Sequence, residues 1–243
     1  MEKLVQKGVY STKKMDAILS NTNARERLLI DIETRGSFAY NAFIDSIHDG
    51  GLNEYKMTSN PRGFTVIINN YDDDDDDDDD CAALENVFNY LGFQLSVNHN
   101  LTSIETKTLL TRLSEYDHSR LDCIAVCILT HGTVNVTEIV DCFEKCETLN
   151  GKPKLFFIQA CQVDETIVVQ PQSLPRGCDV SITYSTLDRQ YKFIQSLCKV
   201  FHSYSTKHDL MSMLTLANGT IKSNQVAATQ HGLCKKLFLR PVH

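Results

Sequence analysis

Two residues of this sequence have the types and positions that nucleophilic catalysis requires. Cys161 closely follows the apolar run 155–158, and His131 follows the apolar run 123–129. Cysteine catalysis needs a thiolate, an imidazole that holds or takes the thiol proton, and donors for an oxyanion. Spacing between separate strands is a weak signal, so an inert cysteine beside a histidine of the core is the alternative interpretation.

The apolar pattern predicts the strands and helices that would position this pair. Short apolar or alternating runs predict strands at 64–68, 93–97, 121–129, 154–158, 181–184 and 237–239. Helical spacing predicts helices at 84–91, 136–143, 191–201 and 209–217, and Thr102 to Glu105 form a capping box that opens another. Strands that alternate with helices indicate a mostly parallel sheet with helices on both faces. Sites in such sheets form at the carboxyl ends of the strands, which is where His131 and Cys161 fall.

This geometry also supplies candidate donors for the oxyanion. The backbone N–H groups of Gly132 and Cys161 are expected to face a developing negative charge at the ends of these two strands. Gly132 has no side chain to block the approach of a substrate. We therefore name His131, Gly132 and Cys161 as candidate catalytic residues.

Composition excludes several other classes of protein. A 243-residue chain with 42% hydrophobic residues can bury a core without disulfides or metal, so we expect no metal and no cofactor. A net charge of −7 argues against a nucleic-acid partner. The nine cysteines are scattered and odd in number, which is typical of reduced thiols in the cytoplasm. The chain starts without an apolar signal core and has no run of membrane-spanning length, so we expect no membrane association.

One segment breaks the globular pattern. Residues Asp72 to Asp80 are nine consecutive aspartates between the first predicted strand and the first predicted helix after it. Like charges at this density repel one another, so we expect a disordered, solvated loop of low complexity.

The amino-acid sequence around the candidate cysteine resembles that of the caspases. Gln159-Ala160-Cys161-Gln162 fits the caspase signature, although Val163 departs from it. Further segments resemble the same family: Gly151 through Ile158, Pro61-Arg62-Gly63 with Ile67 through Asn70, Asp117-His118-Ser119, Leu129 through Gly132, Tyr184-Ser185-Thr186, Phe193 through Leu197, and Lys235 through Phe238. The resemblance covers residues 51 to 240. It implies a caspase-like three-layer α/β sandwich and a cysteine endopeptidase with Cys161 as nucleophile and His131 as the partner that handles protons.

The substrate pocket departs from the family pattern. The resemblance implies that Gln159 binds the substrate aspartate together with two arginines, one from the loop after the first strand and one after Tyr184 to Thr186. The first loop here holds Tyr71 and the aspartates, and the only arginine near the second position, Arg189, is out of register. Burying a substrate carboxylate without its charge partners costs several kcal/mol.

Other parts are short compared with the family. The connection from His131 to Cys161 is reduced, and only a brief segment, with Asp164 as a candidate cleavage point, stands where the family has its processing linker. The segment that pairs across the dimer in the family is cut to 231–234. Dimerisation and activation by the family's route are therefore in question.

The first 50 residues resemble part of a caspase recruitment domain (CARD). Residues 28–37 carry this likeness, and together with the ending at 235–238 they make the CARD-containing initiator caspase of the apoptosome the nearest relative by sequence resemblance. We expect a partial CARD-like helical segment at 1–50, a linker at 51–63 and a caspase-like domain at 64–243. Within that domain we expect a large-subunit part at about 64–164 and a small-subunit part at about 178–243.

Three hypotheses for function follow. The first is a degenerate caspase of the cytoplasm that cleaves aspartyl substrates poorly and regulates programmed cell death by binding other caspases or a CARD-containing adaptor. The second is an active cysteine endopeptidase that cuts a peptide or protein substrate. The third is a truncated product without a stable fold.

Overall fold

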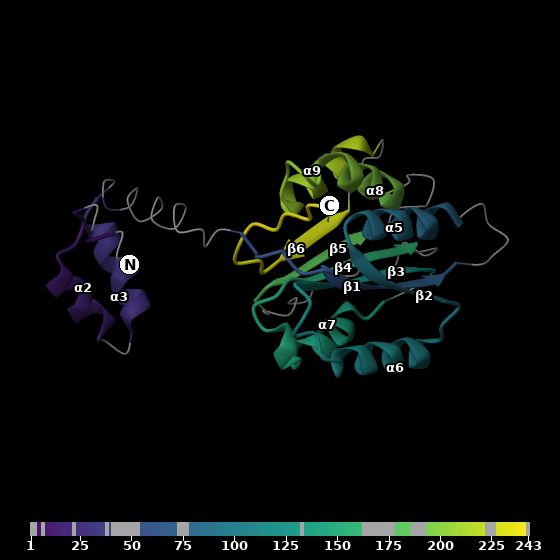
Figure 1. The fold of residues 1–243 in the computed structure, drawn as a ribbon, viewed down its shortest axis with the longest axis horizontal. Helices are drawn as coiled ribbons and strands as arrows, with labels where there is room; N and C mark the ends of the chain where they lie inside the picture. Colours follow the sequence, from purple (N-terminus) through teal and green to yellow (C-terminus); the bar gives the residue numbers. More distant parts are fainter. Residues whose placement is uncertain are drawn as a thin grey trace, which may run out of the picture. The chain divides into compact units, whose positions relative to one another are not determined.

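The computed structural model describes residues 4–5, 8–20, 23–36, 39, 54–71, 78–131, 134–161, 178–185, 193–221 and 227–241. The chain divides into two compact units, Met1–Glu54 and Tyr55–His243. Helices and strands carry the labels of Figure 1.

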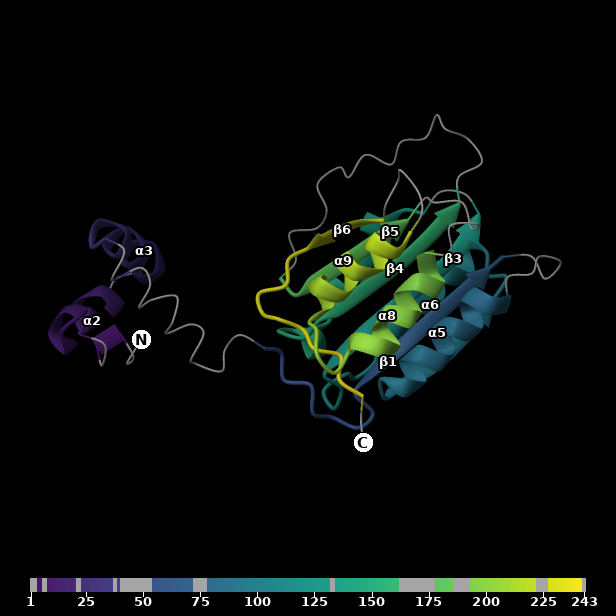
Figure 2. The same cartoon turned by 90° about the horizontal axis from the view of Figure 1, so that it is seen from above.

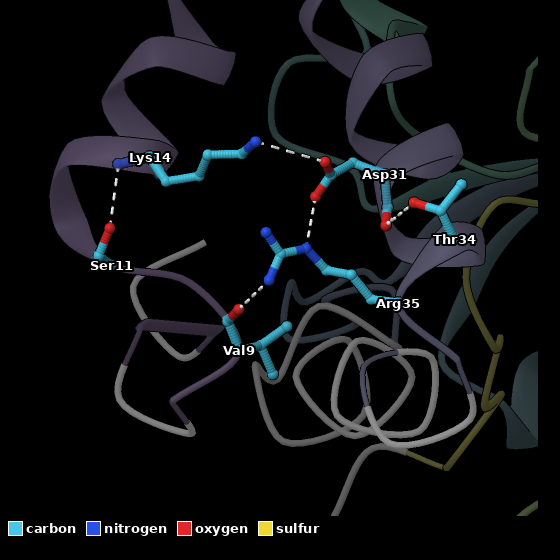
Figure 3. A network of polar contacts seen from close by, with 6 residues as sticks. All are labelled: Val9, Ser11, Lys14, Asp31, Thr34 and Arg35. Atoms are coloured by element: carbon cyan, nitrogen blue, oxygen red, sulfur yellow. Dashed lines mark hydrogen bonds and ion pairs between the residues drawn. The ribbon is translucent and has the colours of Figure 1, made fainter.

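The first unit holds two described helices, α2 (Thr12–Leu19) and α3 (Ala24–Thr34). The side chain of Ser11 caps α2 by accepting a hydrogen bond from the N–H of Lys14. Arg35 donates to Asp31 at 2.7 Å and to the Val9 carbonyl at 2.9 Å, which ties the end of α3 to the first residues of the unit (Figure 3). The described residues show these two helices around a small apolar cluster and do not show a CARD bundle.

The second unit is built on a six-stranded sheet with the order β2-β1-β3-β4-β5-β6. Its strands are β1 (Gly63–Asn70), β2 (Phe93–His99), β3 (Cys123–His131), β4 (Lys154–Cys161), β5 (Val180–Ser185) and β6 (Ala228–His231). The first five strands pair in parallel, and β6 pairs antiparallel with β5. The predicted mostly parallel sheet is confirmed.

Helices cover both faces of this sheet, which gives three layers (Figure 1). On one face lie α5 (Asp78–Tyr90), α8 (Phe193–Tyr204) and α9 (Leu210–Thr220), and Figure 2 shows them laid over the strands. On the other face lie α6 (Ser103–Ser114) and α7 (Val136–Glu144), and the 3-10 turn η1 (Glu147–Leu149) follows α7. Alternate residues of the central strands fill two separate cores, so β3 and β4 are apolar along almost their whole length.

Local signals explain where several elements begin. Thr102 accepts a hydrogen bond from the N–H of Glu105, and the Glu105 carboxylate accepts from the N–H of Thr102, so the predicted capping box opens α6. The last aspartates of the acidic run, Asp78 to Asp80, form the first turn of α5. The expectation of a loop is therefore wrong for them. Acidic residues favour the positive end of the helix dipole, so a helix can start inside the run. The rest of the run, 72–77, lies outside the described residues.

The end of the chain differs from its prediction. Residues 237–239 do not form a strand, although the side chains of Leu237 and Leu239 are buried in the core beneath α8 and α9. The strand that closes the sheet is instead β6, which the sequence analysis did not predict. Three of its four residues are exposed, so it carries no apolar signal, and backbone pairing with β5 defines it.

Candidate active site

The two candidate catalytic residues are partners in the register of the sheet. His131 is the last residue of β3 and Cys161 the last of β4, and their Cα positions pair across the parallel ladder. Parallel strands that end level place both backbones at the same carboxyl edge, as the sequence predicted. The side chain of Cys161 and the whole of Gly132 lie outside the described residues, so the oxyanion donors stay a prediction.

His131 is held against an aromatic ring. Its imidazole is exposed, and its centroid lies 4.8 Å from the ring of Tyr71 with the planes inclined by 53°. Tyr71 itself is only 3% exposed and directly follows β1. Its hydroxyl donates to the backbone carbonyl of Gln159 at 3.3 Å. One buried side chain therefore connects the strand ends that carry His131 and Cys161.

Gln159 occupies the position that the caspase resemblance gives to substrate binding. It lies two residues before Cys161 in β4 and is 2% exposed. Strand alternation puts it on the face of Phe157, which packs beneath α5 and α8. Its register partners are Leu129 on one side and Ser185 of β5 on the other. A buried amide at this edge can bind a polar substrate group, and its role stays a prediction.

Tyr71 is the site residue whose contact the sequence analysis missed. The sequence identifies it only as the residue that precedes the aspartates. The available signal was strand alternation, since Ile67, Asn69 and Tyr71 continue one face of β1 into the site. The side chain of Asn69 accepts a hydrogen bond from the N–H of Tyr71 at 3.3 Å, which fixes the turn away from the strand.

A cavity of about 300 Å³ opens beside His131 on the opposite face of the sheet. It lies between α6 and α7 over the ends of β1 and β3, with an apolar floor of Ile68, Leu110 and Ile128. Its polar groups already bind one another: Asn70 with the backbone of Leu101, Lys107 with Glu138, and Asn135 with the N–H of Glu138. The one lysine among its described lining residues, Lys107, is therefore already paired with a carboxylate.

No arginine in the described part of the second unit lies at the carboxyl edge of the sheet. Among the described residues of the second unit, the arginines lie toward the amino ends of the parallel strands or in the last turn of α6: Arg62, Arg112, Arg120 and Arg240. The Arg62 guanidinium donates to the carbonyls of Met57 at 2.6 Å and Leu91 at 3.2 Å, and burial lowers its pKa. Arg189 lies outside the described residues, as does Asp164.

Three other thiols of the core are poorly placed to act as nucleophiles. Cys123, Cys127 and Cys198 are buried, and desolvation raises the pKa of each thiol well above its usual value. Cys142 and Cys146, four residues apart, do not gather further ligands, and no group of three potential metal ligands occurs in the part of the chain that is described. Within the same part, every helix is too short or too polar to cross a bilayer.

Comparison with known proteins identifies the family of the second unit. The family model for the caspase domain matches residues 62–238. The chain belongs to the caspase family. The match contains β1 through β6 and starts after the first unit, so that unit has no part in the assignment.

Individual caspases agree with this assignment. Caspase-1 of Spodoptera frugiperda is 33% identical over 166 residues, which span 54% of this chain and 56% of that protein. Caspase-3 of Xenopus laevis is 29% identical over 231 residues, 78% of each chain. The crystal structure of the Spodoptera caspase-1 superposes with a TM-score of 0.66 at 28% identity, over 78% of this chain and 94% of that one. The structure of its pro form gives a TM-score of 0.68.

These relatives correct one part of the sequence analysis. The family is as expected, but the likeness extends to an insect caspase-1 and to caspase-3 and caspase-7 of vertebrates, not specifically to the CARD-containing initiator. That finer placement rested on residues 28–37, which lie outside the region that matches the family, and on the ending at 235–238, which lies within it.

Proposed function

We propose that this chain is a cytoplasmic caspase homologue of programmed cell death that cleaves aspartyl substrates poorly and regulates an active caspase by binding it. The observation that carries the proposal is the contrast between the two halves of the site. The strand ends that bear His131 and Cys161 are in register, while no described arginine of the second unit lies at that edge of the sheet.

The energetic consequence is a selective loss of turnover. A substrate aspartate that enters the site would leave water without meeting a positive partner among the described residues, at a cost of several kcal/mol. Each 1.4 kcal/mol corresponds to about a tenfold loss of rate, so a loss of roughly 10³-fold or more is expected. The fold, and with it any surface that recognises another caspase, does not depend on this pocket.

The test combines cleavage with inhibition. Purified full-length chain is assayed on peptide substrates with aspartate, asparagine or alanine before the scissile bond, with Cys161→Ala as the inactive control. The same preparations are added to an active effector caspase. We expect negligible cleavage of the aspartyl peptide. We also expect dose-dependent inhibition of the effector caspase, and Cys161→Ala should retain this inhibition. Efficient aspartyl cleavage that Cys161→Ala abolishes would overturn the proposal.

An active endopeptidase of altered specificity is the second candidate. It is favoured by the register of His131 with Cys161 and by the Tyr71 ring that holds the imidazole. In this case Cys161 attacks the scissile carbonyl, His131 protonates the leaving amine, and water then releases the acyl group. The test is the rate of alkylation of Cys161 across pH, compared with His131→Ala. Fast alkylation below pH 8 that requires His131 supports this candidate, whereas equal slow rates exclude an assembled pair.

A further inference from the structure

Two exposed thiols lie at the same junction between β5 and β6, at the opposite end of the sheet from the Cys/His pair. Of the cysteines whose side chains are described, Cys178 and Cys234 are exposed, Cys142 is half-buried and the others are buried. Cys178 lies two residues before β5, and Cys234 lies three residues after β6. The Cys234 thiol donates to the Gly232 carbonyl at 3.6 Å, and Gly232 pairs in turn with Asp179 and Val180, the two residues that follow Cys178.

The backbone around both residues is fixed by a bulge in the ladder. The N–H of Asp179 donates to the Gly232 carbonyl at 2.9 Å, and the N–H of Gly232 donates to the Val180 carbonyl at 2.8 Å. Two residues of one strand thus oppose one residue of its partner, and Asp179 takes a φ of 69°. Aspartate tolerates this left-handed conformation better than most residues. The bulge ends the β5–β6 pairing. Cys178 directly precedes it on one side, and Cys234 follows Gly232 by two residues on the other.

A buried phenol locks the same junction from the inside. The Tyr55 hydroxyl donates to the Asp179 carboxylate at 2.5 Å and accepts a hydrogen bond from the N–H of Cys234 at 3.0 Å. Tyr55 is 6% exposed. The backbones that bear Cys178 and Cys234 are therefore held beside each other at one junction while their thiols are open to solvent, and closely spaced backbones are what a disulfide requires.

We propose that Cys178 and Cys234 form a reversible intrachain disulfide when the protein meets a small-molecule disulfide such as oxidised glutathione. One thiol loses its proton and attacks a glutathione sulfur, which releases one reduced glutathione and leaves a mixed disulfide. The second thiol loses its proton and displaces the other glutathione, which also leaves reduced. Two S–H bonds of the protein and the S–S bond of oxidised glutathione break, while one S–S bond forms in the protein and two S–H bonds form on the released glutathione molecules, which take both electrons and both protons.

The bond would act where the sheet is weakest. β6 pairs with β5 over only four residues, and most of its side chains are exposed, so little packing holds it. The disulfide would close a loop through β5, α8, α9 and β6 and restrict the unfolded chain. An exposed disulfide is also open to reduction, which suits a reversible modification better than a permanent staple.

The experiment uses the full-length Cys161→Ala chain, so that its outcome does not depend on the proposed catalytic pair. Partial burial, the charge of Asp179 and the Cys178 thiol raise the pKa of Cys234, so the oxidised glutathione is kept in large excess for hours. Remaining thiols are alkylated, and the digest is mapped by mass spectrometry without reduction. We expect a linked peptide pair containing Cys178 and Cys234, a rise of roughly 5–10 °C in the unfolding midpoint, and reversal of both by dithiothreitol.

Matched variants separate this result from general oxidation. Cys178→Ser and Cys234→Ser each lose the linked peptide and the shift in midpoint, whereas Cys142→Ser keeps both. Glutathione attached separately to Cys178 and Cys234, linkage of either to another cysteine, or an oxidised chain with an unchanged midpoint would overturn the proposal.

Discussion

Tyr71 gives the sharpest test of how the candidate site is assembled. Its ring lies against the imidazole of His131, and its hydroxyl reaches the carbonyl of Gln159, two residues before the candidate nucleophile. Three substitutions separate these contacts. Tyr71→Phe removes only the hydroxyl, Tyr71→Leu keeps apolar volume without an aromatic ring, and Tyr71→Ala removes both.

The magnitudes follow from the geometry. The hydrogen bond to Gln159 is long, at 3.3 Å, so its loss should cost about 0.5 kcal/mol, the low end for a neutral bond. The ring contact contributes about 0.5–1.5 kcal/mol, and truncation of a buried ring to alanine costs about 3–5 kcal/mol of stability through the cavity that it leaves. Displacement of a catalytic group by 1 Å can cost about 10²-fold in rate. We therefore expect Tyr71→Phe to alkylate at Cys161 within about threefold of the parent chain, and Tyr71→Leu and Tyr71→Ala roughly 10- to 100-fold more slowly near neutral pH.

The assay is the rate of Cys161 carboxymethylation between pH 5 and 10, read by mass spectrometry of the peptide that contains Cys161. The rates of all variants should converge at high pH, where the thiol ionises without help from His131. Tyr90→Ala is the matched control. The Tyr90 ring also packs against a histidine, His202, with 4.5 Å between the ring centroids, and this pair lies away from the site. Circular dichroism confirms that each variant is folded. Folded Tyr71→Leu with the rate and pH profile of the parent would refute a positioning role for the ring.

Three further predictions concern stability. Gly63→Ala should lower the free energy of unfolding by about 1–3 kcal/mol in urea, because its new Cβ would lie 2.6 Å from a carbonyl oxygen of β3 and from a ring carbon of β2. Gly219→Ala, at an open position in α9, should raise it by about 0.5–1 kcal/mol. His118→Gln should flatten the pH dependence of stability between about pH 7 and 5, measured by urea unfolding at each pH. Burial lowers the pKa of His118, so the unfolded chain takes up a proton first and the parent loses stability as pH falls through about 6.5.

Each of these has an outcome that would contradict it. Gly63→Ala with unchanged stability would mean that β1 and its neighbours lie further apart than described. A loss of stability in Gly219→Ala would place an obstacle where the structure has open space. If His118→Gln and the parent chain show the same slope against pH, His118 does not carry the difference in proton uptake, and carboxyl groups become the source of any slope.

The parallel strands were predictable because almost every residue in them carries the same apolar signal. Both faces of β3 and β4 are buried, so nearly every residue from Cys123 to Leu129 and from Leu155 to Ile158 is apolar. Alternation with amphipathic helices then leaves few ways to arrange the chain. The pairing of His131 with Cys161 in the sheet follows from this, because each residue lies just after the apolar run of its strand.

The features that the sequence did not predict lack such a repeated apolar signal. β6 has exposed side chains and is defined by hydrogen bonds to β5, more than 40 residues earlier in the chain. The contact of Tyr71 with His131 likewise joins the ends of two strands: alternation along β1 places Tyr71 on one face of the sheet, but no pattern within either segment shows the contact. Pairing across the sheet is a property of the assembled fold, so local periodicity does not report it.

The acidic run shows how composition and position can point in opposite directions. Nine aspartates in a row predict a solvated loop when only their mutual repulsion is considered. The last of them, however, directly precede an apolar stripe with helical spacing. Leu84 and Phe88 of this stripe lie on the side of α5 that faces the sheet, and both are fully buried. Packing of that stripe fixes the helix, and the positive end of its dipole favours carboxylates in the first turn. The helix therefore extends backward into the run as far as Asp78, and the same charges that oppose a compact loop favour the start of α5.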